Sequence, residues 1–268
     1  VQYTLRVDPG NYVALNLLGR ELERSGDLGG AGANYDEALR LDPRYIDAYV
    51  SRGRLRYRHG DLPGSEEDFD AVIRLNPSTE DAFLGRGTVR QARGNRDGAM
   101  EDYDMALLAG ADPAPVLRAR AVLFHAQGRL VEAIEDYSAL LKLGPGSAYD
   151  FVDRGRLKKE GGDLNGALED FNSAIRLAPE MAAVHVDRAV VRRALGDAEG
   201  ALADCSEAIR LDPREPLGYF NRGILHAEKN NGEAARADFL KALEVAPPDW
   251  PYRAQASAAL ERTPITAE

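Results

Sequence analysis

Residues 46–79 read IDAYVSRGRLRYRHGDLPGSEEDFDAVIRLNPST, and this stretch decides the fold. Its first part, 46–59, contains no proline and spaces its apolar side chains as an amphipathic helix does. Gly60 and Asp61 then predict a turn, because glycine suits the left-handed position after a helix and aspartate caps the next one. A second amphipathic run, 62–75, ends at an Asn-Pro pair. The stretch therefore predicts a helix–turn–helix unit.

The same pattern returns every 34 residues along the chain. Glycine recurs at this interval in the turn, and an aromatic side chain or cysteine recurs in the second helix. These positions are Gly26, Gly60, Gly94, Gly128, Gly162 and Gly196, and Tyr35, Phe69, Tyr103, Tyr137, Phe171, Cys205 and Phe239. A fixed period of this length is typical of a solenoid, in which each repeat buries its apolar face against its neighbours. We therefore expect an all-α fold.

We expect one solenoid domain over 1–268, with seven complete units and one extra helix. The units are 12–45, 46–79, 80–113, 114–147, 148–181, 182–215 and 216–249, with 1–9 as the tail of a truncated repeat, 250–262 as a capping helix and 263–268 as a frayed tail. Pro113 comes two places later than the other unit-ending prolines, which predicts a longer turn and a shorter helix after it. Val1 in place of methionine favours a processed chain or a piece of a longer protein.

Residue types at fixed places within the unit are also repeated. The eighth place holds a small residue in all seven units: Gly19, Gly53, Gly87, Ala121, Gly155, Ala189 and Gly223. The twentieth place is alanine in six of them: Ala31, Ala99, Ala133, Ala167, Ala201 and Ala235. With the aromatic at place 24 and the proline at place 32, the unit resembles the tetratricopeptide repeat. The resemblance implies a right-handed α-solenoid whose first helices line a concave groove. It also implies binding of peptides or protein segments there, and no intrinsic catalytic centre.

The composition of the chain limits the classes of partner that it is expected to bind. The net charge of −10 makes the chain a poor general binder of nucleic acid or of an anionic membrane. No apolar run approaches the roughly 18 residues of a membrane-spanning helix. One cysteine excludes an intramolecular disulfide and leaves the compartment undecided, with a cytoplasmic location preferred to a periplasmic one. Frequent glycine, alanine and arginine favour a bacterial source.

An arginine and an aspartate change together among the units. Place 7, which is usually apolar in the resembled family, is arginine in six units, and place 23 is aspartate in the same six. The pairs are Arg52 and Asp68, Arg86 and Asp102, Arg120 and Asp136, Arg154 and Asp170, Arg188 and Asp204, and Arg222 and Asp238. The first unit has Leu18 and Asn34 instead. Because a guanidinium matches a carboxylate, we expect structural ion pairs within or between units; the alternative is an arginine ladder that grips an acidic ligand.

The resemblance places the partner-binding groove on places 2, 5, 6, 9, 12 and 13 of each first helix. The candidate partner-binding residues there are Arg20, Arg24, Arg54, Tyr57, Arg58, Arg118, Arg156, Lys159, Val186, Val190, Arg193, Leu217, Phe220 and Ile224. The members from the first two units, Arg20 to Arg58, indicate a site for a carboxylate or phosphate; the alternative is a solvated face paired to Glu23 and Asp47. The apolar members, in the last two units, indicate a hydrophobic anchor site or else packing between helices.

Signals for chemistry are weak. His59, His125, His185 and His226 lack metal-ligand spacing. Cys205 occupies an aromatic core place, which predicts an inert buried thiol. No phosphate loop, nucleophile elbow or dinucleotide glycine pattern is present. We therefore expect no enzyme activity, no metal site and no cofactor.

The function expected from these observations is a non-catalytic scaffold that binds a partner segment in the groove. The partner is another protein or a peptide segment; nucleic acid and a membrane span are not expected, and a homo-oligomer is possible. Two alternatives stay open at this point. The solenoid could self-assemble through an exposed stacking face, or it could be the regulatory arm of a larger protein.

Overall fold

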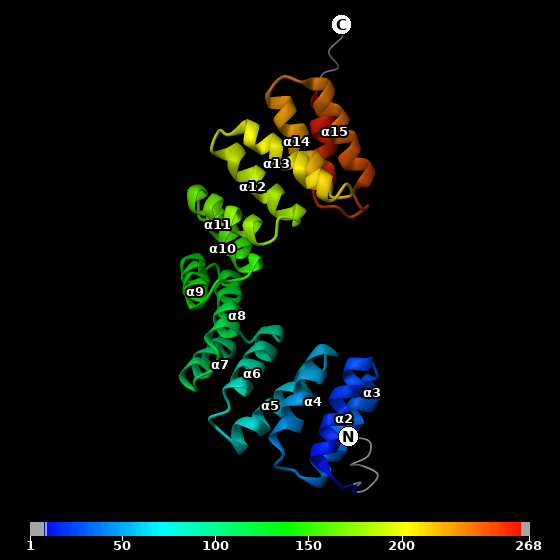
Figure 1. Cartoon of the computed structure of the whole chain (residues 1–268), viewed down its shortest axis with the longest axis vertical. Helices are drawn as coiled ribbons and strands as arrows, with labels where there is room; N and C mark the ends of the chain where they lie inside the picture. Colours follow the sequence, from blue (N-terminus) through cyan, green and yellow to red (C-terminus); the bar gives the residue numbers. More distant parts are fainter. Residues whose placement is uncertain (1–7, 9, 264–268) are drawn as a thin grey trace. The chain divides into compact units, whose positions relative to one another are not determined.

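The computed structural model of the chain describes residue 8 and residues 10–263. Within these residues all regular structure is helical, with 15 helices and no strand (Figure 1). The helices are α2 (Tyr12–Ser25), α3 (Leu28–Leu41), α4 (Ile46–Arg58), α5 (Leu62–Leu75), α6 (Glu80–Ala92), α7 (Arg96–Leu108), α8 (Pro113–Ala126), α9 (Leu130–Leu143), α10 (Ala148–Glu160), α11 (Leu164–Leu177), α12 (Ala182–Ala194), α13 (Ala198–Leu211), α14 (Pro216–Glu228), α15 (Gly232–Val245) and α16 (Arg253–Arg262). The all-helical fold class predicted from the period is confirmed.

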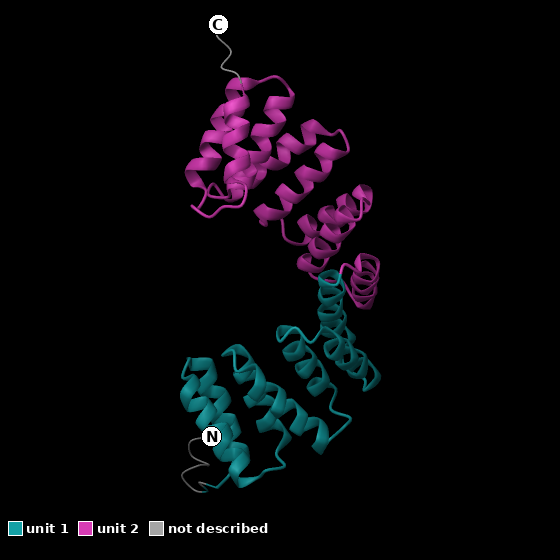
Figure 2. Cartoon of the chain, turned by 180° about the vertical axis from the view of Figure 1, so that it is seen from behind, with its two compact units in different colours: residues 1–127 teal, residues 128–268 magenta. Residues whose placement is uncertain are grey.

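Successive helices pack as helix–turn–helix pairs within two compact units, residues 1–127 and 128–268 (Figure 2). The first unit holds the pairs α2–α3, α4–α5 and α6–α7, then α8; the second holds α9, then α10–α11, α12–α13 and α14–α15, then α16. Each second helix also packs against the first helix of the next pair. First helices of adjacent repeats contact each other directly, as α2 and α4 do, so within each unit they share one face.

The turn between the two helices explains the glycine period. Gly60 has φ +79°, in the left-handed region where a β-carbon is unfavourable, so glycine is the natural residue there. The next residue, Asp61, accepts a hydrogen bond from the Gly64 amide at 3.0 Å and so caps α5. The seventh repeat departs from this rule, because Asn230 takes the same place with φ +56°.

Packing in the core explains why place 8 of the repeat is small and place 24 is aromatic. The Tyr103 side chain is fully buried, and a β-carbon added at Gly87 would come within 2.7 Å of its ring. The two helices of the repeat therefore approach each other closely only because place 8 has almost no side chain. Cys205, which replaces the aromatic residue in the sixth repeat, is also fully buried.

Three local expectations need correction or qualification. The helix after Pro113 is not shortened: α8 begins at Pro113 itself, with Asp112 accepting from the Ala114 amide at 3.1 Å, because proline is well suited to the first helical turn. Thr263, expected to fray, is buried and donates its hydroxyl to the Ala259 carbonyl at 2.8 Å. The predicted tail of a truncated repeat, 1–9, lies outside the described residues apart from Asp8, and 264–268 also lie outside them.

Candidate partner-binding site

The repeated arginines lie beside the aspartates with which they vary. Arg52 Nη2 is 2.6 Å from Asp68 Oδ1, and the Asp68 side chain is almost fully buried. The equivalent distances are 2.7 Å for Arg86–Asp102, 2.6 Å for Arg154–Asp170, 2.6 Å for Arg188–Asp204 and 2.8 Å for Arg222–Asp238. Each pair joins the two helices of one repeat. Arg120 and Asp136 belong to different compact units, and their pairing stays a prediction.

Each of these arginines also contacts the preceding repeat. Arg52 Nη1 is 2.6 Å from Asp36 Oδ1, which occupies place 25 of the repeat before it. The other contacts to place 25 are Arg86 to Asp70 at 2.6 Å, Arg120 to Asp104 at 2.7 Å, Arg154 to Ser138 at 3.1 Å, Arg188 to Asn172 at 2.8 Å and Arg222 to Ser206 at 3.3 Å. One guanidinium therefore ties two repeats together. The sequence pattern does not predict the contact with place 25, because the residue there changes from aspartate to serine or asparagine along the chain.

Aromatic rings and second basic residues complete these contacts. The Arg52 guanidinium carbon lies 5.6 Å from the centre of the Tyr49 ring, an arrangement that favours the cation. Arg56 Nη1 lies 2.9 Å from the same Asp68 carboxylate. Burial opposes the charge on Arg52, but the hydrogen bonds that its guanidinium donates to Asp68 and Asp36 outweigh this effect and raise its pKa. The guanidinium is thus occupied on several sides, which argues against a free arginine ladder.

The first helices of the first unit enclose a hollow of about 450 Å³, called here the N-terminal hollow. Its lining residues are Arg20, Glu23, Arg24, Tyr35, Ile46, Asp47, Val50, Ser51, Arg54, Thr79 and Asp81. Two of the basic residues predicted here already have acidic partners. Arg54 lies 3.0 Å from Asp81, and Arg58, beside the hollow, pairs with Glu23. Their charges are therefore balanced within the protein.

Arg20 and Arg24 differ from those two arginines. They lie one turn apart on α2, both are exposed, and neither has an acidic partner within ion-pair distance among the described residues. Burial raises the pKa of the Tyr35 hydroxyl, and the nearby positive charges of Arg20 and Arg24 offset part of this rise. The Tyr35 hydroxyl donates to Glu23 at 2.9 Å. The two arginines thus supply positive charge at the hollow that the described protein leaves unmatched.

A second hollow of about 430 Å³ lies further along the first unit. Tyr57, Arg118 and Val122 contribute to its lining, so two predicted groove residues from different repeats face one space. The Tyr103 hydroxyl donates to Gln91 at 2.6 Å at the base of this hollow. Eight of its nine lining residues occupy the groove places given for the first helices.

The predicted groove residues of the second unit are mostly engaged within the protein. Arg156 lies 2.7 Å from Asp187, and Lys159 lies 3.1 Å from the same side chain. Arg193 donates to Glu228 at 3.0 Å. Each of these contacts joins a first helix to the first helix of the next repeat. The basic side chains predicted there therefore stabilise the stack.

The apolar anchor expected in the last two repeats is partly wrong. Val186 is 5% exposed and Phe220 is 8% exposed, so neither is available to a partner. The Phe220 ring packs against Trp250 at 5.8 Å and Tyr252 at 6.2 Å between ring centres. The segment before α16 covers it, and no repeat pattern indicates that cover. Val190, Leu217 and Ile224 are partly exposed.

Comparison with known sequences identifies the repeat. Family models described as Tetratricopeptide repeat match residues 16–80, 50–115, 84–148, 152–216 and 218–249. The chain belongs to the tetratricopeptide repeat family. The search among curated proteins gave no match. Members of this family generally bind proteins or peptides and are generally non-catalytic, so this tetratricopeptide repeat chain is a protein-interaction scaffold in that general sense.

Several solved structures have the same fold as this chain. A tetratricopeptide repeat protein from Parabacteroides merdae is 19% identical with a TM-score of 0.63, over 93% of this chain and 97% of that one. The C-terminal part of a TPR repeat-containing protein from Cytophaga hutchinsonii is 13% identical with a TM-score of 0.74, over 91% and 98%. PilF of Pseudomonas aeruginosa is 19% identical with a TM-score of 0.65, over 80% and 97%. At these identities the likeness shows the fold alone.

The described residues hold no arrangement typical of a metal site or of a membrane-spanning helix. No group of three or more His, Cys, Asp or Glu side chains there is arranged to hold a metal ion. Among the described helices, none combines the length and the hydropathy that a bilayer-spanning segment needs. Burial raises the pKa of the Cys205 thiol to about 12, which leaves it a poor nucleophile.

Proposed function

We propose that this tetratricopeptide repeat scaffold holds a segment of a partner protein on the first-helix face of residues 10–127. An acidic side chain of that segment binds Arg20 and Arg24 at the N-terminal hollow. The observation that carries this proposal is the contrast in charge pairing: Arg54 and Arg58 have acidic partners, whereas Arg20 and Arg24 have none among the described residues. An exposed guanidinium pair is a ready partner for a carboxylate or phosphate.

The net charge of the chain is a second reason to place an acidic segment at Arg20 and Arg24. The protein carries −10 overall, so an acidic segment is repelled by most of its surface and attracted only where cations are unmatched. Arg118 and Tyr57 line the adjacent hollow and offer the same segment polar and aromatic contacts further along. Arg156, Lys159 and Arg193 are not included, because Asp187 and Glu228 occupy them.

The test is capture of partners from source-cell extract by the full chain and by charge-removed variants. Arg20→Ser/Arg24→Ser removes the proposed contact. Arg74→Ser/Arg96→Ser is the matched control, since it removes the same charge from exposed places on second helices of the same unit, where no ion pair is formed among the described residues. We expect a specific partner to bind the wild type and the control, and to bind the Arg20/Arg24 variant about fivefold to tenfold more weakly.

Charge exchange gives the decisive step. The bound segment is mapped by crosslinking, and its acidic residue is changed to lysine in combination with Arg20→Glu/Arg24→Glu. Recovered binding of the doubly exchanged pair supports direct contact. A partner retained equally by all variants would place its binding surface elsewhere on the molecule and refute the proposal.

A further inference from the structure

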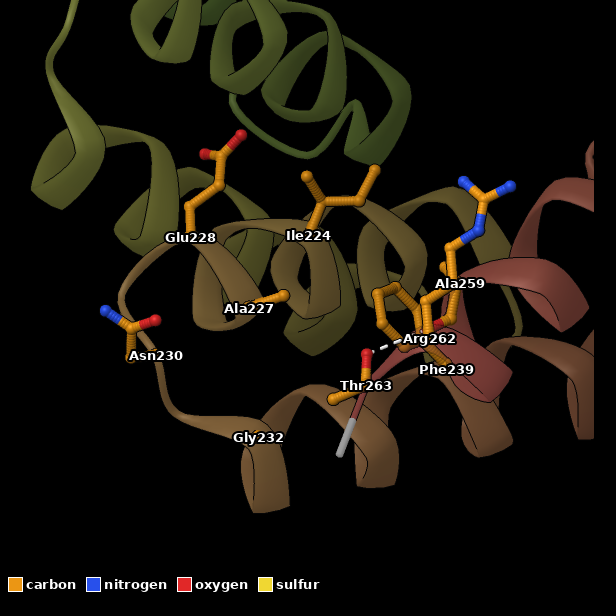
Figure 3. A pocket seen from close by; sticks show the side chains of 9 residues that line it. All are labelled: Ile224, Ala227, Glu228, Asn230, Gly232, Phe239, Ala259, Arg262 and Thr263. Atoms are coloured by element: carbon orange, nitrogen blue, oxygen red, sulfur yellow. Dashed lines mark hydrogen bonds between the residues drawn. The ribbon is translucent and has the colours of Figure 1, made fainter. Parts of the chain in front are cut away.

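A third hollow, of different character, lies within residues 128–263. It is called here the C-terminal hollow and has a volume of about 580 Å³ between α14, α15 and the end of α16 (Figure 3). Its apolar wall consists of Ile224, Ala227, Phe239 and Ala259. Of these, only Ile224 and Ala227 occupy groove places of the repeat. The others belong to the second helix and to the extra helix, so the repeat pattern alone does not predict this space.

Hydrogen bonds hold the wall of the C-terminal hollow in place. Arg236 on α15 donates to the carbonyl of Leu260 at 2.9 Å and to that of Thr263 at 3.0 Å. These carbonyls lie at the end of α16, where no intrahelical donor remains for them. The end of α16 is therefore fixed to α15, and the hollow exists before any ligand arrives.

The polar rim of the C-terminal hollow carries one unmatched cation. Glu228 is neutralised by Arg193, which donates to it at 3.0 Å. Arg262, on the opposite side in Figure 3, has no acidic partner among the described residues. An apolar wall beside an unmatched guanidinium is complementary to a ligand with a bulky apolar group and a carboxylate.

Asn230 contributes a polar side chain at the same rim. Six other repeats place glycine at this left-handed position, with φ between +74° and +88°, whereas Asn230 adopts φ +56° with a side chain present. Its side-chain amide has no hydrogen-bond partner among the described residues, and the residue lines the hollow. Asparagine is the usual alternative to glycine in this left-handed position after a helix, so the turn is kept. Here the substitution adds a donor and an acceptor at the mouth of the hollow.

We propose that the C-terminal hollow binds a peptide segment of a partner protein through one aliphatic or aromatic side chain and an adjacent carboxylate. The side chain enters between Ile224, Phe239 and Ala259. The carboxylate lies against Arg262, and the Asn230 amide contacts the peptide backbone at the rim. This site is separate from Arg20 and Arg24, and its existence does not depend on the function proposed for them.

The test uses small probes of the proposed chemistry and methyl NMR of the full chain. N-acetyl-L-leucine carries both groups, N-acetyl-L-leucinamide lacks the carboxylate, and N-acetylglycine lacks the side chain. For N-acetyl-L-leucine we expect saturable shifts of the Ile224, Ala227 and Ala259 methyl signals with a Kd of about millimolar order. We expect the leucinamide to bind about threefold more weakly and N-acetylglycine not to saturate.

Variants assign the roles of the individual side chains. Ala227→Leu fills the hollow and abolishes the shifts, whereas Ala194→Leu, an exposed alanine on α12, leaves them unchanged. Arg262→Gln weakens N-acetyl-L-leucine about threefold without affecting the leucinamide, and Arg262→Lys restores part of the difference. Asn230→Gly keeps the turn and weakens both leucine probes, since only the amide is lost.

Several outcomes would overturn the proposal. Shifts that do not saturate, or that are equal for leucine and glycine probes, show no side-chain pocket. Shifts retained in Ala227→Leu place the probe elsewhere. Binding that appears only after removal of residues 264–268 shows that the chain's own end, not a partner, is the occupant. Dispersed methyl signals in each variant confirm that a lost response does not result from unfolding.

Discussion

At the scale of the residue, one arginine contacts several neighbours in each of five repeats. Arg188 contacts Asp204 in its own repeat and Asn172 in the preceding one. The sequence predicts the first contact, because arginine and aspartate change together between copies. It does not predict the second, since serine, asparagine and aspartate at place 25 look like ordinary exposed helix residues. Only the packing of one repeat on the next brings them within reach.

Asp204 gives a prediction about pH. Burial opposes its ionisation, but the His185 ring and the Arg188 and Arg192 guanidinium groups outweigh that effect and lower its pKa. A lowered folded-state pKa adds stability above the unfolded value of about 3.9, and this stability is lost as the pH falls through the folded value. We expect Asp204→Asn to lower the unfolding free energy by about 3 kcal/mol at pH 7, because Arg188 and Arg192, whose side chains are largely buried, lose their counter-charge.

Urea unfolding of wild type and Asp204→Asn at a series of pH values checks this expectation. The difference in unfolding free energy between wild type and Asp204→Asn should shrink below about pH 4, where the wild-type Asp204 carboxylate becomes protonated and loses its charge. Asp249→Asn, at an exposed position, serves as the control and should change little. A difference that stays constant across the acid range would mean that the stabilisation from Asp204 is not carried by its charge.

At the scale of the element, helices and turns follow from the period, but the ends of the stack do not. The left-handed glycine recurs in six of the seven repeats, and an aspartate or asparagine side chain caps the second helix in six, so helices such as α4 and α5 are predictable from the repeated sequence. The C-terminal hollow depends on where α16 begins and on Arg236 reaching its last carbonyls. Neither feature repeats, and so no comparison between copies reveals it. Phe220 was misassigned for the same reason.

The contacts between neighbouring repeats predict a dependence on salt. In the first unit Arg86 meets a charged partner, Asp70, whereas in the second unit Arg188 meets the neutral Asn172. We expect Asp70→Ser to lower the unfolding free energy by about 0.5 kcal/mol in low salt and by much less near 0.5 M NaCl, because this pair is partly exposed and is screened.

Urea titrations at the two salt concentrations measure that effect. Asn172→Asp is the reciprocal variant and should gain a similar small, salt-sensitive stabilisation. If Asp70→Ser were equally destabilising at both concentrations, the Asp70 contact would act through hydrogen-bond geometry and not through charge.

At the scale of the whole molecule, stability comes from contacts between neighbouring elements in the sequence. Each second helix packs against its own first helix and against the next one, as α5 does with α4 and α6. A helix with neighbours on both sides should therefore open less often than one at an end. We expect slower amide exchange in α5 and α12 than in α2 and α16, measured by hydrogen–deuterium exchange with peptide resolution. Uniform protection from α2 to α16 would instead indicate a single cooperative unit.

The spacing of the arginine contacts has a consequence for how such a chain changes length. Apart from Arg120, whose forward partner stays a prediction, each repeated arginine reaches 16 residues forward to its aspartate and 16 residues back to the preceding repeat. Loss of residues 46–79 by recombination would bring Arg86 to Asp36, one carboxylate in place of another, and duplication of the same segment would recreate both contacts. The arginine contacts between repeats would therefore be kept when a module of 34 residues is gained or lost at this point.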